Sequence, residues 1–407
     1  MPEEAKSDAN DLRLYQVRVE GFKANRQVRM NIADRFTLLI GNNGSGKSTI
    51  LQAIGFFSYI VGGKGEAFFA ERVWKPQDIR FRSSPRSRST VVRVAMYFKW
   101  RGRELRWEVS WGLNGSSLFS ENVKVRDHDG APVEDLLLFD AREGGKTAAG
   151  TEIPAFSITG SILPAIEFMV KAEEGALFDA LVRWAGGIRS LELLSPYAMK
   201  GGTRSSPGDM GIKGDKLAGF LASLSAEQKS RVVKRLSRVY PIKELNTTRK
   251  RAGWIDMQIA EKYRNMVAVP VMHMSDGFMR LLALCSIPEL GKHTSLVLLD
   301  EIEDGIEPHI LPDIVDLIVR ESTAQIIATS HSPLLVNHIG VDDVRYIARD
   351  ADGVTTAVDA DKLKSFSIGA DFFGAGEMWT SSPVDALSAE ASDEAKSEEK
   401  RRPNGDL

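Results

Sequence analysis

The sequence predicts an α/β protein in which a glycine-rich loop joins a buried strand to a helix, and three observations support this fold class. A nearly all-apolar run over residues 36–40 ends at the glycine-rich segment, and a plausible helix follows over 48–59. Residues 296–328 contain two further apolar runs separated by a helical stretch, which is the spacing of a βαβ unit with a parallel strand pair. Apolar and polar residues alternate over 92–113, which is typical of an antiparallel hairpin.

Composition narrows the class of protein further. The chain has 407 residues, 43% of them hydrophobic, which is enough for the cores of two or three domains. The first ten residues are polar and no apolar run reaches about 18 residues, so we expect neither a signal peptide nor a membrane span. The single cysteine, Cys285, excludes an internal disulfide and any cysteine-clustered metal site, and we expect it to lie in a helix core. We therefore expect a cytoplasmic protein without a membrane partner.

The formal net charge of −2 conceals an uneven distribution of charge. Residues 72–106 hold eleven basic residues against two acidic ones, and residues 229–251 hold nine against one. Residues 385–399 hold six acidic residues against one basic residue. The two basic segments indicate that a polyanion remains a candidate partner in spite of the balanced total.

Taken in order, the elements alternate between sheet and helix. Residues 11–40 predict two strands that lead into a third, and the alternation over 92–113 predicts a β-meander after the first helix. From about 162 to 240 the hydrophobic period becomes helical, and near Met266 the chain returns to short strands. After about Ser381 the composition is rich in Ala, Ser, Glu and Lys without a period, which predicts disorder.

The glycine-rich segment matches the pattern G-x-x-x-x-G-K-[ST], in the strand-to-helix context that this motif requires. Its glycines let consecutive backbone N–H groups converge on a β-phosphate, and the helix N-terminus adds a favourable dipole. Lys47 is expected to reach the β- and γ-phosphates, and the Ser48 hydroxyl to bind Mg²⁺. ATP and Mg²⁺ are the expected cofactors. The predicted nucleotide-binding residues of this phosphate loop are Gly41, Asn42, Asn43, Gly44, Ser45, Gly46, Lys47, Ser48 and Thr49.

Two acidic residues and a histidine follow the later apolar runs. Asp300 is placed to hold Mg²⁺, directly or through water, and Glu301 to activate the attacking water. His331 ends the next strand, at the edge of the sheet where ligands of open α/β sheets bind. A neutral imidazole there can hydrogen-bond both the γ-phosphate and the water. We therefore predict Glu301 and His331 as catalytic residues.

A third motif selects among nucleotide-hydrolysing proteins. Ser275-Asp276-Gly277 precedes an apolar helix and lies 25 residues before Asp300. A hydroxyl, a glycine and the free N–H groups of a helix start are suited to an anion. This order and spacing resemble the signature motif of ABC-type ATPases, whose serine and glycine bind the γ-phosphate held by the other subunit.

The combined motifs resemble the SMC/RecF/OLD branch of ABC-type ATPases, and within it the stand-alone RecF-like proteins whose signature reads Ser-Asp-Gly-x-x-Arg. The resemblance covers roughly residues 11–110 and 265–380. It implies an ABC-type P-loop NTPase head with an antiparallel β subdomain and an inserted helical lid. It also implies a homodimer that sandwiches two ATP·Mg²⁺, with Ser275 and Gly277 acting in trans. The supporting residues are 41–49, 275–277, 300–303 and 329–333.

Several positions depart from the family pattern or extend it. Phe278 replaces the usual signature glutamine, and Ile306-Glu307-Pro308 stands where relatives often have Leu-His-Pro. Gln77, after the first helix, is a further candidate Mg²⁺ ligand in the position of a Q-loop. Gly376-Glu377-Met378-Trp379 resembles a C-terminal element of such proteins, and the sequence assigns it no role.

The 228 positions between Lys47 and Ser275 are too many for a transporter ATPase and too few for the arms of an SMC coiled coil, so a compact lid fits best. The expected organisation is a flexible tail (1–10), an N-terminal lobe with phosphate loop and β-meander (11–130), a mainly helical insertion (131–264), a C-terminal lobe (265–380) and a disordered tail (381–407).

RecF-like head dimers are expected to bind duplex DNA on the surface that ATP closes, through non-specific and salt-sensitive phosphate contacts. Only 76 residues follow His331, which leaves no room for a nuclease domain, so a nuclease or toxin partner would be separately encoded. The predicted function is an ATP-hydrolysing switch in bacterial DNA maintenance or anti-phage defence. The alternative is a nucleotide-gated scaffold that holds an effector with little turnover and no DNA contact. The candidate DNA contacts are Arg80, Arg82, Arg86, Arg88, Arg249, Lys250 and Arg251.

Overall fold

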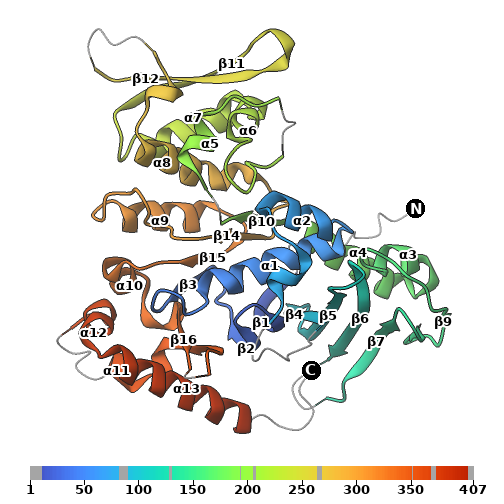
Figure 1. Cartoon of the computed structure of the whole chain (residues 1–407). Coiled ribbons are helices and arrows are strands. Elements are labelled where there is room, and N and C mark those ends of the chain that lie inside the picture. The colour runs from blue at the N-terminus through green and yellow to red at the C-terminus, as the bar shows by residue number, and fades with distance from the viewer. Residues whose placement is uncertain are drawn as a thin grey trace.

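Two β-sheets lie one above the other with helix α1 between them, and a smaller subdomain extends from one end (Figure 1). This arrangement comes from a computed structural model. It describes residues 12–81, 90–127, 131–192, 194–204, 208–263, 268–350, 352–367 and 373–401.

The central sheet has six strands among the described residues, all parallel except the last. Side chains alternate across each strand, so Leu38 faces the core on the lid side whereas Leu39 faces the core around α1. Both faces of β3 are covered, which explains why its sequence is apolar except for Thr37, whose buried hydroxyl accepts from the Ala33 N–H at 2.9 Å. In spatial order the strands are β10 (Ile188–Leu191), β14 (Leu296–Leu299), β15 (Gln325–Thr329), β3 (Phe36–Ile40), β16 (Val344–Arg349) and β17 (Thr355–Asp359).

The second sheet is antiparallel and extends the predicted meander. It has eight strands in the described part of the chain and continues to Ile153, beyond the expected boundary at 130. Its strands are β2 (Asn25–Asn31), β1 (Arg13–Phe22), β4 (Val91–Trp100), β5 (Arg103–Gly112), β6 (Ser117–Arg126), β7 (Glu134–Asp140), β8 (Gly144–Thr147) and β9 (Glu152–Ile153).

Helices cover both faces of the central sheet. On the side of the antiparallel sheet lie α1 and α4, and on the other side lie α8, α9 and α10 (Figure 1). No helix in these described segments is both long and apolar enough to cross a membrane. The helices outside the lid are α1 (Lys47–Val61), α2 (Gly65–Arg72), α3 (Leu163–Ile166), α4 (Ala172–Gly186), α8 (Asp276–Ser286), α9 (Leu311–Glu321), α10 (Pro333–Ile339), α11 (Lys364–Ser367), α12 (Ala375–Ser381) and α13 (Val384–Arg401). Short 3-10 helices are η2 (Pro76–Ile79), η3 (Glu167–Met169), η4 (Arg251–Gly253), η5 (Val271–His273), η6 (Ile287–Leu290), η7 (Val341–Asp343) and η8 (Ala360–Lys362).

The insertion differs from the expected helical unit over 131–264. Its first part completes the antiparallel sheet, α4 packs in the α1 core, and β10 adds a parallel strand to the central sheet. Only residues 196–261 form a separate lid, and a hairpin accounts for much of it. Helical periodicity could not foresee β10, because a four-residue strand carries too little pattern. The lid comprises α5 (Pro196–Lys200), α6 (Leu217–Ser223), α7 (Ala226–Leu236), β11 (Ile242–Arg249) and β12 (Ile255–Glu261), with β13 (Val269–Pro270) pairing beside it.

A buried ionic network joins the lid to the helix that follows Ser275. Arg235 on α7 donates to Glu289 Oε1 at 2.6 Å, to Glu321 Oε2 at 2.7 Å and to the Cys285 carbonyl at 3.1 Å. The side chains of Arg235 and Glu289 are only 4% and 2% exposed. Lid and signature helix are therefore held as one body. Cys285 itself lies buried in α8 as predicted, and burial raises the pKa of its thiol to about 12.

The expected disorder after Ser381 is wrong for residues 384–401, which form α13. Leu387 and Ala391 on this helix are buried in the core, and Ala395, four residues further on, packs against it. Glu390 and Glu398 bind partners on the segment before α12, with Glu390 Oε2 accepting from Ser365 Oγ at 2.6 Å. Small residues carry most of the helical period of this segment, so its hydrophobic pattern is too weak to predict a helix. Residues 1–11 and 402–407 lie outside the described residues.

Glu121 ties the antiparallel sheet to the segment before α3. Its fully buried carboxylate accepts hydrogen bonds from Trp107 Nε1 at 2.8 Å, Ser161 Oγ at 2.7 Å and the backbone N–H of Ile162 at 2.7 Å. Burial raises the pKa of Glu121, and these hydrogen bonds only partly offset that effect.

We expect Glu121→Ala to lower the free energy of unfolding by about 3 kcal/mol, because three buried donors lose their acceptor. Urea unfolding at pH 7 measures the change. Glu134→Ala, at an exposed carboxylate on β7, is the matched control and should change stability by less than about 0.5 kcal/mol. If Glu121→Ala lowers the free energy of unfolding by less than about 1 kcal/mol, water must enter the site and accept the hydrogen bonds of the three donors in place of the carboxylate.

Candidate functional site

The phosphate loop follows β3 directly and leads into α1. Gly41, Gly44 and Gly46 have φ angles of 141°, 76° and 111°, in the region that favours glycine. A Cβ at Gly41 would lie 2.1 Å from the Ile347 carbonyl oxygen on β16, and one at Gly46 would lie 2.5 Å from Thr355 Oγ1 on β17. The loop is therefore held by the edge hairpin of the central sheet, and its shape requires these glycines.

Lys47 is buried at the start of α1 and turns back onto its own loop. Its Nζ donates to the carbonyls of Gly41 at 2.8 Å and Asn42 at 3.1 Å. Burial lowers the pKa of Lys47, and nearby Asp300 and Glu301 partly oppose this. Ser45 Oγ is buried without a hydrogen-bond partner among the described residues. A phosphate group in the loop would satisfy both side chains.

Ser48 and Asp300 come together although 252 residues separate them. Ser48 Oγ donates to Asp300 Oδ1 at 3.0 Å, and Thr329 Oγ1 donates to the same oxygen at 2.6 Å. The parallel pairing β14–β15–β3 causes this, because it brings the C-terminal ends of the three strands to one edge. A hydroxyl and a carboxylate oxygen in contact are ligands that fit Mg²⁺ beside nucleotide phosphates.

Glu301 has a φ of 49°, an unusual backbone for a residue with a side chain. Thr329 Oγ1 accepts a hydrogen bond from the Glu301 N–H at 2.7 Å, which fixes this conformation. Such a residue costs about 1 kcal/mol or more, so the surrounding structure must enforce it. Next to it, Glu303 Oε1 accepts from the His331 N–H at 2.5 Å, which holds the histidine loop against the acidic loop.

These residues line one pocket of about 380 Å³. The phosphate loop and the start of α1 form one wall, and Asp300, Glu301, Thr329 and His331 form another. The structure thus brings together the phosphate loop, both predicted acids and the predicted histidine.

Two basic residues of this pocket were missed by the sequence analysis. Lys23 lies in the turn between β1 and β2, donates to Gln52 Oε1 at 2.8 Å and lies 3.5 Å from the centre of the Trp74 ring. Burial, followed by the charge of Arg72, lowers the pKa of Lys23 to about 8. Arg349, at the end of β16, borders the same pocket and donates to the Gly353 carbonyl at 2.8 Å. No local signal marks Arg349, because only the pairing of β16 with β3 brings it to the phosphate loop.

The signature residues lie elsewhere in the chain. Ser275 caps α8 by accepting from the Phe278 N–H at 3.2 Å, and Asp276 accepts from Lys200 on α5 at 2.7 Å. A Cβ at Gly277 would lie 2.4 Å from the Gly305 carbonyl oxygen, so the signature packs against the loop that follows Asp300. None of these signature residues lines the phosphate pocket of the same chain.

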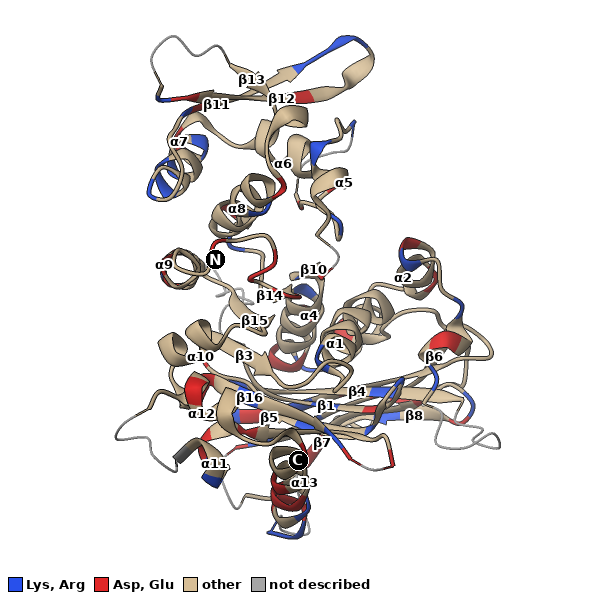
Figure 2. Cartoon of the chain, turned by 60° about the vertical axis from the view of Figure 1, so that its left-hand side comes forward, with Lys and Arg blue, Asp and Glu red and all other residues tan. Residues whose placement is uncertain are grey.

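The structure does not bring the remaining predicted residues to the pocket. Gln77 is exposed on η2 and is not part of the pocket wall. Arg80 follows η2 and pairs with Phe22 at the antiparallel sheet. Arg82, Arg86 and Arg88 lie outside the described residues. The cluster Arg249–Arg251 is exposed at the tip of the β11–β12 hairpin, at the far end of the lid (Figure 2).

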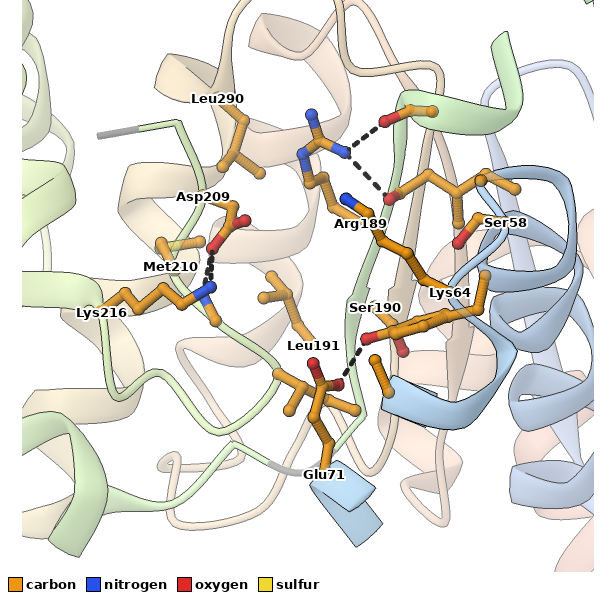
Figure 3. A pocket seen from close by; sticks show the side chains of 17 residues that line it. Ser58, Lys64, Glu71, Arg189, Ser190, Leu191, Asp209, Met210, Lys216 and Leu290 are labelled. Atoms are coloured by element: carbon orange, nitrogen blue, oxygen red, sulfur yellow. Dashed lines mark hydrogen bonds and ion pairs between the residues drawn. The ribbon is translucent and has the colours of Figure 1, made fainter. Parts of the chain in front are cut away.

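A second pocket, of about 340 Å³, lies between the end of α1, β10 and the lid (Figure 3). Some of its polar side chains are paired: Tyr59 donates to Glu71, Lys216 lies 3.4 Å from Asp209, and Arg189 donates to two backbone carbonyls. Arg189 Nε and Ser190 Oγ, in contrast, are buried without a hydrogen-bond partner among the described residues. It shares no residue with the phosphate pocket.

Comparisons with known proteins agree with this geometry. A family described as "AAA ATPase domain" matches residues 13–86, which include the phosphate loop. A family described as "AAA domain, putative AbiEii toxin, Type IV TA system" matches residues 214–337, which include the signature, both acids and His331. No curated protein matches the chain in sequence.

Among solved structures, the chain is similar to an SMC head bound to the C-winged helix domain of ScpA, with 17% identity and a TM-score of 0.51 over 85% of this chain and 97% of that chain. Other similar structures are an SMC head domain from Thermotoga maritima (14% identity, TM-score 0.46, 85% and 98% covered) and an Smc head domain with a coiled coil and joint derived from Pyrococcus yayanosii (14%, 0.48, 86% and 97%). The first match confirms the predicted fold class.

Proposed function

We propose that this chain, an ABC-type ATPase of the RecF/SMC-like class, is a molecular switch that two copies form by closing around two ATP·Mg²⁺. One observation carries the proposal. The phosphate pocket brings together the phosphate loop, Asp300, Glu301 and His331 without the signature, and Ser275 caps an exposed helix start outside it. A second copy that supplies Ser275 and Gly277 would complete the pocket.

Each residue of the pocket has a task in this switch. Lys47 and the loop N–H groups bind phosphate oxygens, and Ser48 with Asp300 would hold the Mg²⁺ that neutralises phosphate charge. Glu301 accepts a proton from the attacking water, and its fixed backbone aims the carboxylate into the pocket. His331 donates or accepts a hydrogen bond at the γ-phosphate. Hydrolysis removes the contact between the copies and resets the switch.

Complementation between two inactive variants tests the proposal. Lys47→Ala removes the phosphate contact of its own chain, and Ser275→Arg blocks the signature offered to the partner. Each variant alone should lose ATPase activity. An equal mixture should recover up to about a quarter of wild-type activity, because half of the dimers then hold one intact composite site.

The activities of the two variants, alone and mixed, distinguish a site shared between two copies from the other arrangements. No recovery, with both variants folded by circular dichroism, would contradict a site shared between copies. Activity of Ser275→Arg alone would place catalysis within one chain. ATP binding by wild type without turnover would favour the nucleotide-gated scaffold.

The partner of the switch is proposed from charge and from the family description. The exposed residues Arg249–Arg251 suit phosphate contacts that weaken as salt rises, so we propose DNA as one partner. The family description over residues 214–337 names a toxin of a type IV toxin–antitoxin system. That description applies to the matched domain itself. The second partner that we propose is a separately encoded toxin or nuclease in defence or DNA maintenance.

A further inference from the structure

The groove beside the phosphate loop is acidic, although the loop itself must bind a polyanion. One wall is formed by Asn42–Ser45 and the other by α13, with Asp385 and Asp393 facing it, and Asp350 and Asp352 lie at the end of β16. Lys396 lies 4.0 Å from Asp393, and Arg349 is the other base that lines the groove. Asp385 forms no ion pair with a described residue, and the Asp393 side chain is 82% exposed. The groove is thus suited to a cationic segment rather than to a nucleotide.

Such a segment is exposed at the opposite end of the same chain. Arg249 and Arg251, at the β11–β12 hairpin tip, are exposed and form no ion pair with a described residue. Beside them, Arg204 lies 4.9 Å from the centre of the Trp254 ring, and Trp254 is 42% exposed. Between the two exposed arginines, Lys250 pairs with Asp256 on β12, so the cations of the tip without an ion pair to a described residue are Arg249 and Arg251, next to an aromatic surface.

The hairpin and the signature both contact one short segment of the lid, residues 200–203. Thr203, which pairs with Ile255 next to the tip, lies three residues after Lys200, and Lys200 binds Asp276 of the signature. The phosphate loop itself forms part of the groove, because Asn42–Ser45 line it.

The four elements follow one another along the long axis of the molecule. In both views the order is the β11–β12 hairpin, α8, the β3–α1 region and α13 (Figures 1 and 2). Figure 2 shows a basic stretch on the hairpin, with acidic residues elsewhere on its strands, and both acidic and basic residues on α13, where the acidic ones predominate. A two-fold rotation that brings α8 of one copy to the phosphate loop of the other reverses this order. It therefore also brings each hairpin tip toward the partner's α13.

We propose that the basic hairpin tip of one copy docks in the acidic groove between α13 and the phosphate loop of the second copy. The inference rests on the ATP sandwich proposed above and adds two symmetric charged contacts to it. It assigns the acidic C-terminal helix a role in closure, and it makes DNA a competitor of α13 for the same hairpin.

A charge exchange tests the contact, with Glu301→Gln as background so that hydrolysis does not open the dimer. Dimer dissociation constants are measured with ATP by sedimentation at low and at moderate salt. Arg249→Glu/Arg251→Glu should weaken the dimer at least about tenfold at low salt and less at higher salt. Asp385→Lys/Asp393→Lys should do the same. Mixing the two double variants should restore both contacts in each mixed dimer, because the reversed hairpin then meets the reversed groove and the native hairpin meets the native groove. The chain carrying all four changes should approach the affinity of the background.

Lys146→Glu/Lys292→Glu is the matched control, with the same change of net charge at exposed positions away from the groove and the hairpin. If the background variant forms no dimer with ATP, the sandwich itself is overturned. If it dimerises but the reversals act no more strongly than the control, the hairpin contact is overturned and the sandwich stands. Weakening by either reversal without recovery in the four-fold variant would also overturn the contact, because those residues then act on something other than each other.

Discussion

Glu301→Gln is expected to lower ATP hydrolysis at least about 100-fold while ATP still binds. Glutamine keeps the shape of the side chain but cannot take a proton from water. The phosphate contacts of Lys47 and Ser48 do not involve this carboxylate, so nucleotide affinity should remain within about threefold of wild type. ATP should therefore trap the closed state, and a dimer should accumulate in size-exclusion chromatography with light scattering.

The control is Glu307→Gln, at an acid that is 74% exposed six residues later. It should keep both hydrolysis and the monomer–dimer equilibrium of wild type. Full hydrolysis by Glu301→Gln would show that Glu301 is not the general base. His331, which lines the same pocket, would then be the candidate base.

Arg235→Ala is expected to lower the free energy of unfolding by about 3 kcal/mol, because the buried Glu289 loses its buried cation and Glu321 loses the same partner. Arg231 also donates to both oxygens of Glu289, at 2.9 and 2.6 Å, but its side chain is 51% exposed, so solvent screens its charge. Chemical unfolding at pH 7 measures the loss. Arg231→Ala is the graded control, and should cost about 1 kcal/mol or less because that pair borders solvent.

The same network gives a pH dependence. Burial alone would raise the pKa of Glu289, but hydrogen bonds from Arg231 and Arg235 more than offset it and hold the pKa below its usual value of 4.5. A depressed pKa means that the stabilisation is fully present above pH 4.5 and is lost as the pH falls through the folded-state pKa. The difference between wild type and Arg235→Ala should therefore shrink below pH 4.5. A difference that stays constant with pH would assign the loss to packing of the arginine stem.

Much of the candidate site could be predicted because each part is a local pattern. The phosphate loop needs positive φ angles at fixed positions, and the glycines at 41, 44 and 46 predict those angles. Ser275 is recognisable as a helix cap from its neighbours alone. The ends predicted for the strands 36–40 and 296–299 are correct, since Thr37 is the single polar residue in the two strands and both are bounded by polar or glycine residues.

Other parts could not be predicted, since they depend on which segments pair. Arg349 reaches the pocket through β16, and β10 joins the central sheet after an interval without strands. The helix α13 was missed because Ala391 and Ala395 carry its buried face, and small residues weaken a hydrophobic period.

The sequence by itself determined the chemistry of this protein: a phosphate loop, two acids, a histidine and a signature at recognisable spacings. Those motifs are readable because they depend on backbone conformation and on the ends of short strands, which neighbouring residues specify. Only the tertiary structure decided where they lie relative to one another. It brings Asp300 to Ser48 across 252 residues, keeps Ser275 out of the pocket and folds an acidic helix beside the phosphate loop. Strand pairing and core packing between distant segments determine these positions, and no local pattern encodes them.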